Sequence, residues 1–285
     1  MKTPTLGEEK MKLVLRPEAT APTMRYLIDH PDILLEAKTR PIKVYYCGSM
    51  FRHDRPQKGR YREFFQFGIE HIGTDSVVSD AENIIMANQI LKDLHIPIYK
   101  LHINSIGTLQ CRQLYNAKLQ EYFSTTDRTL SEETKDKVAA GMPLFRILDS
   151  KKQEDMSAIE NAPKIYDCLK EESKLKFDRV QNILKENSVD YIVDHKMVRG
   201  LDYYYDICYE FKVEHENLGP SQNTVIGGGR YDSLSDTLGA RQIIPASGWA
   251  AGINRLIEVI PDLSMTSGSK IDIILALVIF DCDEE

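Results

Sequence analysis

Clustered cations mark the segment between residues 51 and 62. Its five basic residues are Arg52, Arg55, Lys58, Arg60 and Arg62. One acid, Asp54, opposes them, which leaves a net charge of +4 in twelve residues. Because guanidinium groups fork onto phosphate oxygens, arginines on a loop suit a polyphosphate ligand. A solvated charged hairpin fits the composition equally well, so at this point both interpretations stay open.

The residues that follow this loop suggest a ligand-binding face. Strict alternation along residues 62–71 predicts that Phe64, Gln66, Gly68 and Glu70 share one face of a strand. That face would be an acceptor-rich floor beside the arginines, with Gly68 leaving room for a ligand. The Glu70 carboxylate could then hold an amine or an imidazole N–H. The alternative is an ordinary half-exposed sheet with its polar side outward.

A third segment, residues 199–204, reads Arg-Gly-Leu-Asp-Tyr-Tyr. An arginine before a flexible glycine can reach a carboxylate and a phosphate. Tyr203 and Tyr204 offer phenol groups and an aromatic wall for an imidazole. In isolation, a strand with packed tyrosines is the better interpretation, and the glycine-rich run at 226–232 is by itself a weak turn signal.

Strands and hairpins must position these groups. The expected strands are 42–47, 63–72, 98–103, 191–194, 203–213 and 224–226. The expected helices include 22–29, one that follows a capping box of Ser79 and Glu82, and a last one over 249–260. Ser105 is a candidate cap for the helix after 98–103, and the glycines at 227–229 are expected to break their strand. Strands separated from helices in this way predict an α+β fold with a mainly antiparallel sheet flanked by helices.

Residues 109–187 differ from their surroundings. They are rich in Lys, Glu, Gln and Asp, contain almost no glycine, and have apolar residues at helical spacing. They predict an inserted small helical domain with its own core. The expected division is 1–108 for the first part of the catalytic domain, 109–188 for the insertion, 189–265 for the second part, and 266–285 for a linker and the start of another domain.

Bulk properties restrict the class of protein. The chain has 285 residues, of which 42% are hydrophobic and 28% charged, which is ordinary for a globular protein. No stretch reaches the ~20 apolar residues of a membrane helix, and no signal or transit peptide is recognisable, so we expect a cytoplasmic protein without a membrane partner. The net charge of −7 argues against a nucleic-acid-binding surface over the whole molecule. Five scattered cysteines predict separate reduced thiols and no zinc site.

Taken together, these segments resemble a known family. Residues 51–71 resemble motif 2 of class II aminoacyl-tRNA synthetases in its histidyl form, and 199–204 resembles a motif found in histidyl-tRNA synthetases alone. Residues 226–232 are similar to the second histidine-specific motif, and 248–256 to motif 3. Shorter similarities occur at 16–20, 104–107 and 146–151. The resemblance runs from about residue 12 to residue 260.

The resemblance assigns roles to residues. Arg52 would hold the α-phosphate of ATP, Arg255 the distal phosphates, and Arg199 the substrate carboxylate and the transition-state charge, so these three are the expected catalytic residues. Arg60 would complete the ATP-binding set. The expected histidine-binding residues are Glu18, Ala19, Thr20, Gln66, Glu70, Arg199, Tyr203, Tyr204 and Tyr231.

The implied activity is that of a histidine–tRNA ligase. The carboxylate of L-histidine would attack the α-phosphate of ATP, and the histidyl group would pass from the adenylate to the 3′ end of tRNA(His). Magnesium is implied as the partner of ATP, and the full-length protein is expected to be a homodimer. Replacing Arg199 by Ala should abolish ATP–pyrophosphate exchange while the chain still folds.

Two positions depart from the family pattern. Asn254 in motif 3 and Asp54 in motif 2 stand where glutamate is usual, which could change adenine or metal contacts. In the last helix, the expected buried stripe consists of Ile253, Leu256, Ile257 and Ile260. Arg255 lies off that stripe, as a ligand-facing residue should.

Segments that the family has at both ends are absent from this sequence. Motif 1 would lie upstream of residue 16, and residues 270–280 resemble only the first strand of an anticodon-binding domain. We therefore expect a fragment, an engineered piece or a reduced gene product. Two alternatives remain: a regulatory paralogue, like the synthetase-like subunit of ATP phosphoribosyltransferase, that binds histidine without charging tRNA, and a sensor module that binds uncharged tRNA.

Overall fold

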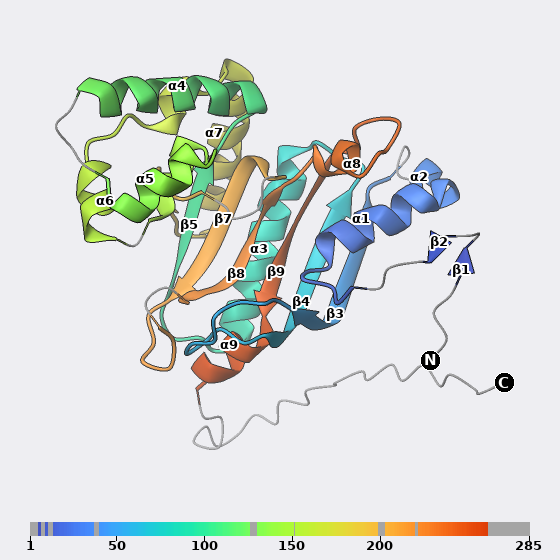
Figure 1. Cartoon of the computed structure of the whole chain (residues 1–285). Coiled ribbons are helices and arrows are strands. Elements are labelled where there is room, and N and C mark those ends of the chain that lie inside the picture. Colours follow the sequence, from blue (N-terminus) through green and yellow to red (C-terminus); the bar gives the residue numbers. More distant parts are fainter. Residues whose placement is uncertain are drawn as a thin grey trace.

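The computed structural model describes residues 5–6, 9–10, 14–36, 40–125, 130–150, 152–198, 203–219 and 222–261. Its centre is a seven-stranded sheet in the order β3-β4-β9-β8-β7-β5-β6. The pair β5–β6 is parallel and the other neighbours in this sheet are antiparallel. The predicted α+β class with a mainly antiparallel sheet is therefore confirmed (Figure 1).

Six of the seven strands of this sheet were located from the sequence, β4 with both ends correct, whereas β9 was not predicted. The seven are β3 (Ile42–Phe51), β4 (Glu63–Ile72), β5 (Tyr99–Ser105), β6 (Ile192–Val193), β7 (Tyr205–Val213), β8 (Thr224–Arg230) and β9 (Ala246–Gly252); a small separate hairpin pairs β1 (Thr5–Leu6) with β2 (Glu9–Lys10). The expected break at residues 227–229 is wrong, because β8 continues to Arg230. At Gly228, a Cβ would overlap the carbonyl oxygen of Gly248 and the side chain of Trp249. Glycine there allows neighbouring strands to approach closely, which keeps the strand intact.

Helices cover one face of the sheet. Helix α3 (Val77–Asp93) crosses the back of the sheet in Figure 1. Its buried residues Ile84, Ala87 and Leu91 join the main hydrophobic core with residues of β5, β7, β8 and β9. The expected capping box is wrong: Ser76 caps the helix by accepting from the Val78 amide. The hydroxyl of Ser79 lies inside the helix instead, 2.8 Å from Nδ1 of His71.

Three further helices pack beside the ends of β4 and β9. These are α1 (Thr20–Asp29), α2 (Pro31–Glu36) and α8 (Leu234–Thr237). A separate cluster of buried residues joins Met24 and Leu27 of α1 to Ile72, Leu234 and Ala246. This cluster fixes the start of α1 beside the ends of β4 and β9.

Residues 109–187 are helical, as expected. They form α4 (Leu109–Thr125), α5 (Glu132–Ala139), η1 (Leu144–Asp149), α6 (Gln153–Ala158), η2 (Ile165–Cys168) and α7 (Glu171–Glu186). Side chains from most of these elements share a second hydrophobic cluster, whereas Phe177, Val180 and Leu184 of α7 belong to the main core. The boundaries at 109 and 188 stay a prediction. Figure 1 shows α4, α5 and α6 gathered beyond β5, at the end of the sheet opposite to α1.

The expected cap of α4 is wrong. Ser105 ends β5, and it is the hydroxyl oxygen of Thr108 that accepts from the Cys111 amide, at 3.3 Å. The sequence spacing could not show which of the two hydroxyl groups, Ser105 or Thr108, caps the helix, because the chain first makes a turn at Gly107, whose φ is +60°.

The last described helix is shorter than predicted. Residues 249–252 belong to β9, and α9 spans Ile253–Val259. Leu256 is buried as expected, but Ile257 is 65% exposed and Val259 takes its place in the core. The predicted stripe was therefore wrong at Ile257.

No helix in the described part of the chain has both the length and the hydropathy to cross a membrane. Four of the cysteines, Cys47, Cys111, Cys168 and Cys208, are free thiols, as predicted. The fifth, Cys282, lies outside the described residues.

Candidate active site

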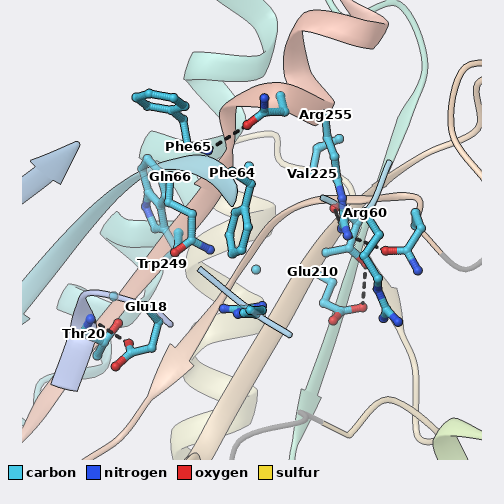
Figure 2. Close-up of a pocket in the computed structure, with 18 of the residues that line it drawn as sticks. Glu18, Thr20, Arg60, Phe64, Phe65, Gln66, Glu210, Val225, Trp249 and Arg255 are labelled. Atoms are coloured by element: carbon cyan, nitrogen blue, oxygen red, sulfur yellow. Dashed lines mark hydrogen bonds between the residues drawn. The ribbon is translucent and has the colours of Figure 1, made fainter. Parts of the chain in front are cut away.

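A cavity of about 510 Å³ opens on the face of the sheet opposite to α3. Residues from β4, β8 and β9, from the 52–62 loop and from the start of α1 line it. In Figure 2, Arg60, Arg255 and Glu210 are grouped at one end, and Glu18 and Thr20 lie at the other. The cavity therefore has a cationic end and a carboxylate end.

Most of the site residues expected from the sequence meet in this cavity. Those that line it are Glu18, Thr20, Arg52, Arg60, Gln66, Glu70, Tyr203, Tyr204, Tyr231 and Arg255. Ala19 does not line it; this residue is buried and its carbonyl accepts the Thr23 amide and hydroxyl. Arg199, the principal expected catalytic residue, lies outside the described residues together with 200–202.

Glu70 is the buried centre of the carboxylate end. The Thr20 hydroxyl donates to its Oε1 at 2.7 Å, and the Tyr231 hydroxyl donates to its Oε2 at 2.5 Å. Only 1% of the residue is exposed. Burial raises the pKa of Glu70 to about 8, although the two hydrogen bonds lower it. This carboxyl group therefore keeps its proton to a higher pH than a solvated carboxyl group does.

Glu18 lies next to this group because the chain starts a helix here. Its two carboxylate oxygens accept from the amides of Thr20 and Ala21, at 2.7 and 3.0 Å. These are amides of the first turn of α1, which have no partner within the helix. The side chain thus serves as a cap and still presents acceptor positions to the cavity, because a carboxylate has about four lone-pair sites.

Tyrosines form one wall of this end. The rings of Tyr203 and Tyr204 lie 5.3 Å apart, and Tyr203 meets Tyr231 edge-on at 6.0 Å. Burial raises the pKa of Tyr203 and Tyr231 above the usual range, so both keep their phenol proton. They can donate or accept a hydrogen bond while excluding water from a flat ligand.

The predicted alternation of β4 is confirmed, with one correction. Phe64, Gln66 and Glu70 face the cavity. The expected space over Gly68 is not open to a ligand, because the ring and hydroxyl of Tyr46 on β3 occupy it. The glycine makes room for its cross-strand partner Tyr46, which was missed because a single strand does not reveal what its neighbour places above it.

Three arginines face the other end. Arg255 donates to the carbonyls of Gly59 and Thr224, at 2.8 and 2.7 Å. Burial, followed by repulsion from Arg60 and Arg52, lowers the pKa of Arg255 below its usual range. An arginine nevertheless stays protonated in a protein, so the three cations raise the local positive potential. A polyanion would relieve this repulsion.

Arg52 and Arg60 approach this end from the loop between β3 and β4. Arg52 donates to the carbonyl of Pro17 at 2.9 Å, and its guanidinium lies 4.9 Å from the centre of the Phe64 ring. Arg60 lies 3.7 Å from Asp54, one of the two departures from the family pattern. Asp54 therefore neutralises part of the charge of the loop.

Several cavity residues were not among the predicted site residues. They include Tyr46, Glu210, Gln222 and Thr224, together with Asp54 and Asn254, which were noted only as departures. The Asn254 side-chain oxygen accepts the Phe65 amide at 2.7 Å, so it joins α9 to the start of β4. Glu210 lies opposite Gly227 in the pairing of β7 with β8. A glycine on the neighbouring strand is the one signal that would have indicated a cavity-facing carboxylate.

The described residues offer limited support for a metal. No three of their His, Cys, Asp and Glu side chains converge in a way that could hold a metal ion. Mg²⁺ is commonly held by one or two carboxylates together with substrate phosphates. Glu210 and Asp54 are carboxylates at the cationic end that fit this use, because both line the cavity: Glu210 interacts with the charge of Arg255, and Asp54 lies 3.7 Å from Arg60.

Comparison with known proteins identifies the family. The sequence model described as histidyl-tRNA synthetase matches residues 7–256. The histidine–tRNA ligase of Lactobacillus johnsonii is 40% identical over 264 residues, which cover 90% of this chain and 60% of that protein. The chain thus spans about three-fifths of the length of that relative.

Solved structures agree. An apo histidyl-tRNA synthetase from S. aureus has a TM-score of 0.68 and 32% identity, with 90% of this chain and 59% of that chain covered. A structure described as an ATP phosphoribosyltransferase regulatory subunit/histidyl-tRNA synthetase from Bacillus halodurans has a TM-score of 0.58 and 21% identity, covers 90% of this chain and 67% of that chain, and supports the fold alone. On the family match over most of its length, this chain belongs to the histidyl-tRNA synthetase family.

Proposed function

We propose that this chain activates L-histidine with ATP, forming histidyl-adenylate and pyrophosphate. The observation that carries the proposal is the single cavity, which has a carboxylate and tyrosine end and an arginine end. An amino acid and a polyphosphate that meet in one cavity can react without a nucleophilic side chain. Such a displacement depends on positioning and on charge neutralisation.

At the carboxylate end, the proposed ligand is histidine. Its α-ammonium group would donate to Glu18 and to the buried oxygen of Gln66, which has no hydrogen-bond partner among the described residues. Its imidazole would lie against Tyr203 and Tyr204 with Glu70 as a partner. A site that hydrogen-bonds both imidazole nitrogens rejects other side chains, by ~10⁴ in favourable cases, because its buried polar groups would stay unpaired.

At the cationic end, the proposed ligand is the triphosphate of ATP. Arg52 would hold the α-phosphate and Arg255, with Arg60, the distal phosphates. The histidine carboxylate oxygen forms a bond to the α-phosphorus, and the bond from that phosphorus to the bridging oxygen of pyrophosphate breaks. Arg199 would stabilise the charge of this transition state. Bound magnesium would neutralise the charge of the departing pyrophosphate, with Glu210 or Asp54 as its protein ligand.

Transfer of the histidyl group to tRNA(His), homodimerisation and a cytoplasmic location complete the proposal. They rest on family membership, since the chain spans 60% of the length of the L. johnsonii relative.

An ATP–pyrophosphate exchange assay with each of several amino acids tests the proposal. We expect exchange with histidine alone, and loss of exchange in Arg52→Ala but not in Arg25→Ala, whose guanidinium pairs with Asp29 on the surface. Histidine binding without exchange would instead identify a regulatory paralogue. tRNA binding without either would identify a sensor module.

A further inference from the structure

The cavity tyrosines Tyr203 and Tyr204 come just before an irregularity in the sheet. Tyr205 pairs with Arg230, but the next pair is Cys208 with Gly229. Two residues of β7 are therefore left without a partner on β8, which makes a bulge. Such bulges redirect the side chains beside them, here at the edge of the ligand cavity.

One residue of the bulge, Asp206, has an unusual backbone. Its φ is +47°, in the left-handed region that residues other than glycine rarely adopt. A conformation of this kind persists only where the surroundings impose it. The contacts of Asp206 therefore show what determines the position of the neighbouring tyrosines.

The turn after β5 holds the Asp206 backbone from both sides. The Ile106 amide donates to the Asp206 carbonyl at 2.8 Å, and the Asp206 amide donates to the Gly107 carbonyl at 3.2 Å. At Gly107, a Cβ would lie 2.6 Å from a Leu169 methyl and 2.7 Å from Cys111 Cβ. Both of these residues belong to the hydrophobic cluster of the inserted helices. The turn is thus packed between the bulge and the insertion.

The 109–187 region also holds the Asp206 side chain, through helix α7. It is 2% exposed, and burial raises its pKa. A hydrogen bond with Ser173 and the charge of Lys176, both on α7, act in the opposite sense and stabilise the carboxylate. Two separate helices of the 109–187 region therefore reach this short segment, since α4 begins directly after the turn.

Helix α4 also contacts the tyrosine pair directly. The Arg112 guanidinium donates through Nη1 to the carbonyl of Tyr204, at 3.1 Å. Arg112 does not line the cavity, so it reaches a ligand there only through the tyrosine. Its neighbours on the helix, Cys111 and Tyr115, are almost fully buried in the second cluster and fix the helix in place.

We propose that Arg112 is a positioning residue of the amino-acid site. By holding the Tyr204 carbonyl, it transmits the placement of the inserted helices to the wall formed by Tyr203 and Tyr204. The rings of these two tyrosines lie side by side, so a shift at the Tyr204 backbone moves both. The naming of histidine as the ligand rests on the function proposed above; the contact itself does not.

Amide hydrogen exchange tests the contact without reference to activity. In Arg112→Ala, the peptide over residues 203–207 should exchange about tenfold faster than in the unaltered chain, while a peptide over α3 should be unchanged. The control is Gln113→Ala, which removes an exposed side chain from the same helical turn. Unchanged exchange at 203–207 in Arg112→Ala would overturn the proposal, whatever the chain's activity.

Kinetics test the consequence. Arg112→Ala should raise the KM for histidine about tenfold and leave the KM for ATP within twofold, because the arginine end is not touched. Arg112→Lys should restore most of the loss, since an ammonium can still donate to one carbonyl. Equal changes in both KM values, or no recovery with lysine, would show a general structural role and overturn the proposal.

Two further outcomes remain distinguishable. If Arg112→Ala does not fold, Arg112→Met, which keeps an unbranched stem, serves as the variant without a donor. Arg112→Lys and Arg112→Gln must then both exchange more slowly than Arg112→Met at 203–207; equal exchange in the three variants would overturn the proposal. If the unaltered chain shows no histidine-dependent exchange of pyrophosphate, the proposed function fails, whereas hydrogen exchange still decides the role of Arg112.

Discussion

Tyr231 donates its hydroxyl to Glu70 from the end of β8, 161 residues further along the chain, and the two side chains form a buried acid pair at 2.5 Å. Neither group contacts solvent appreciably, since Glu70 is 1% and Tyr231 2% exposed. The pair closes the cavity at the end where the proposed imidazole would lie. Its titration makes the first prediction measurable.

Glu70 should make stability depend on pH in a particular window. Its pKa in the folded chain is about 8, against an ordinary value of 4.5, so the folded state binds the proton more tightly than the unfolded state. The stabilising contribution is complete below the ordinary pKa and is lost as the pH rises through the folded pKa. In Glu70→Gln this loss should disappear.

The measurement is urea unfolding of both chains at about pH 5 and about pH 8.5. The free energy of unfolding of the unaltered chain should fall relative to that of Glu70→Gln over this interval. Two pH profiles that run parallel would contradict the raised pKa.

Gly248 should tolerate no side chain. A Cβ there would overlap the Glu70 carboxylate and the carbonyl oxygen of Ile69, and backbone cannot move aside cheaply. We expect Gly248→Ala to lower the free energy of unfolding by ~2 kcal/mol. Gly252 on the same strand is the matched control, because the nearest atom to its Cβ lies 3.7 Å away. If Gly252→Ala is as destabilising as Gly248→Ala in thermal or urea unfolding, the close approach to Glu70 is not the cause.

Arg255 should control ATP affinity. Its charge-assisted hydrogen bonds also hold the carbonyls of Gly59 and Thr224, so its removal both loses a cation and loosens the loop. Arg255→Ala should raise the KM for ATP by ~10–100-fold. The KM for ATP of Arg255→Lys should lie between that of the unaltered chain and that of Arg255→Ala, since an ammonium keeps the charge but not the planar fork. A KM for ATP that stays within twofold in Arg255→Ala would remove this residue from the phosphate site.

Asn254 should act through the backbone of β4. Its side-chain oxygen accepts the Phe65 amide, so Asn254→Ala should cost about 1 kcal/mol of stability. Asn254→Asp keeps an acceptor at the same position and should stay close to the unaltered chain. The urea midpoints of the three chains decide the matter: an aspartate variant as unstable as the alanine variant would show that the hydrogen bond is not what matters.

Periodicity identified the parts of the site that one strand determines. The alternation of β4 placed Phe64, Gln66 and Glu70 on one face, because successive side chains of a strand point to opposite sides. The arginines of the loop followed from their clustering. The resemblance to the family then placed Tyr231 with them, although it lies 161 residues from Glu70.

Several of the errors share a physical cause, which is a contact with a side chain on another element of the fold. Gly228 remains in a strand because Tyr209 and Trp249 pack against it. The space above Gly68 is occupied by the side chain of Tyr46 from the neighbouring strand. Ser79 has the spacing of a cap, yet His71 uses its hydroxyl. Each local pattern was compatible with the predicted role, but a side chain on a strand of the sheet packs against the residue or binds its hydroxyl.

Small residues supply much of the cavity floor on β8 and β9, beside the larger side chains of Thr224, Val225 and Trp249. Gly227, Gly248, Ala250 and Gly252 line it, and at Gly248 the Cβ of any other residue would strike the Glu70 carboxylate. At such glycine positions, every substitution adds side-chain atoms. No new functional group can therefore be introduced without occupying part of the cavity. At Gly248 this floor can therefore be lost by mutation but hardly retuned. A descendant that acquired a different substrate would have to begin at the walls, in the tyrosines and the arginine loop.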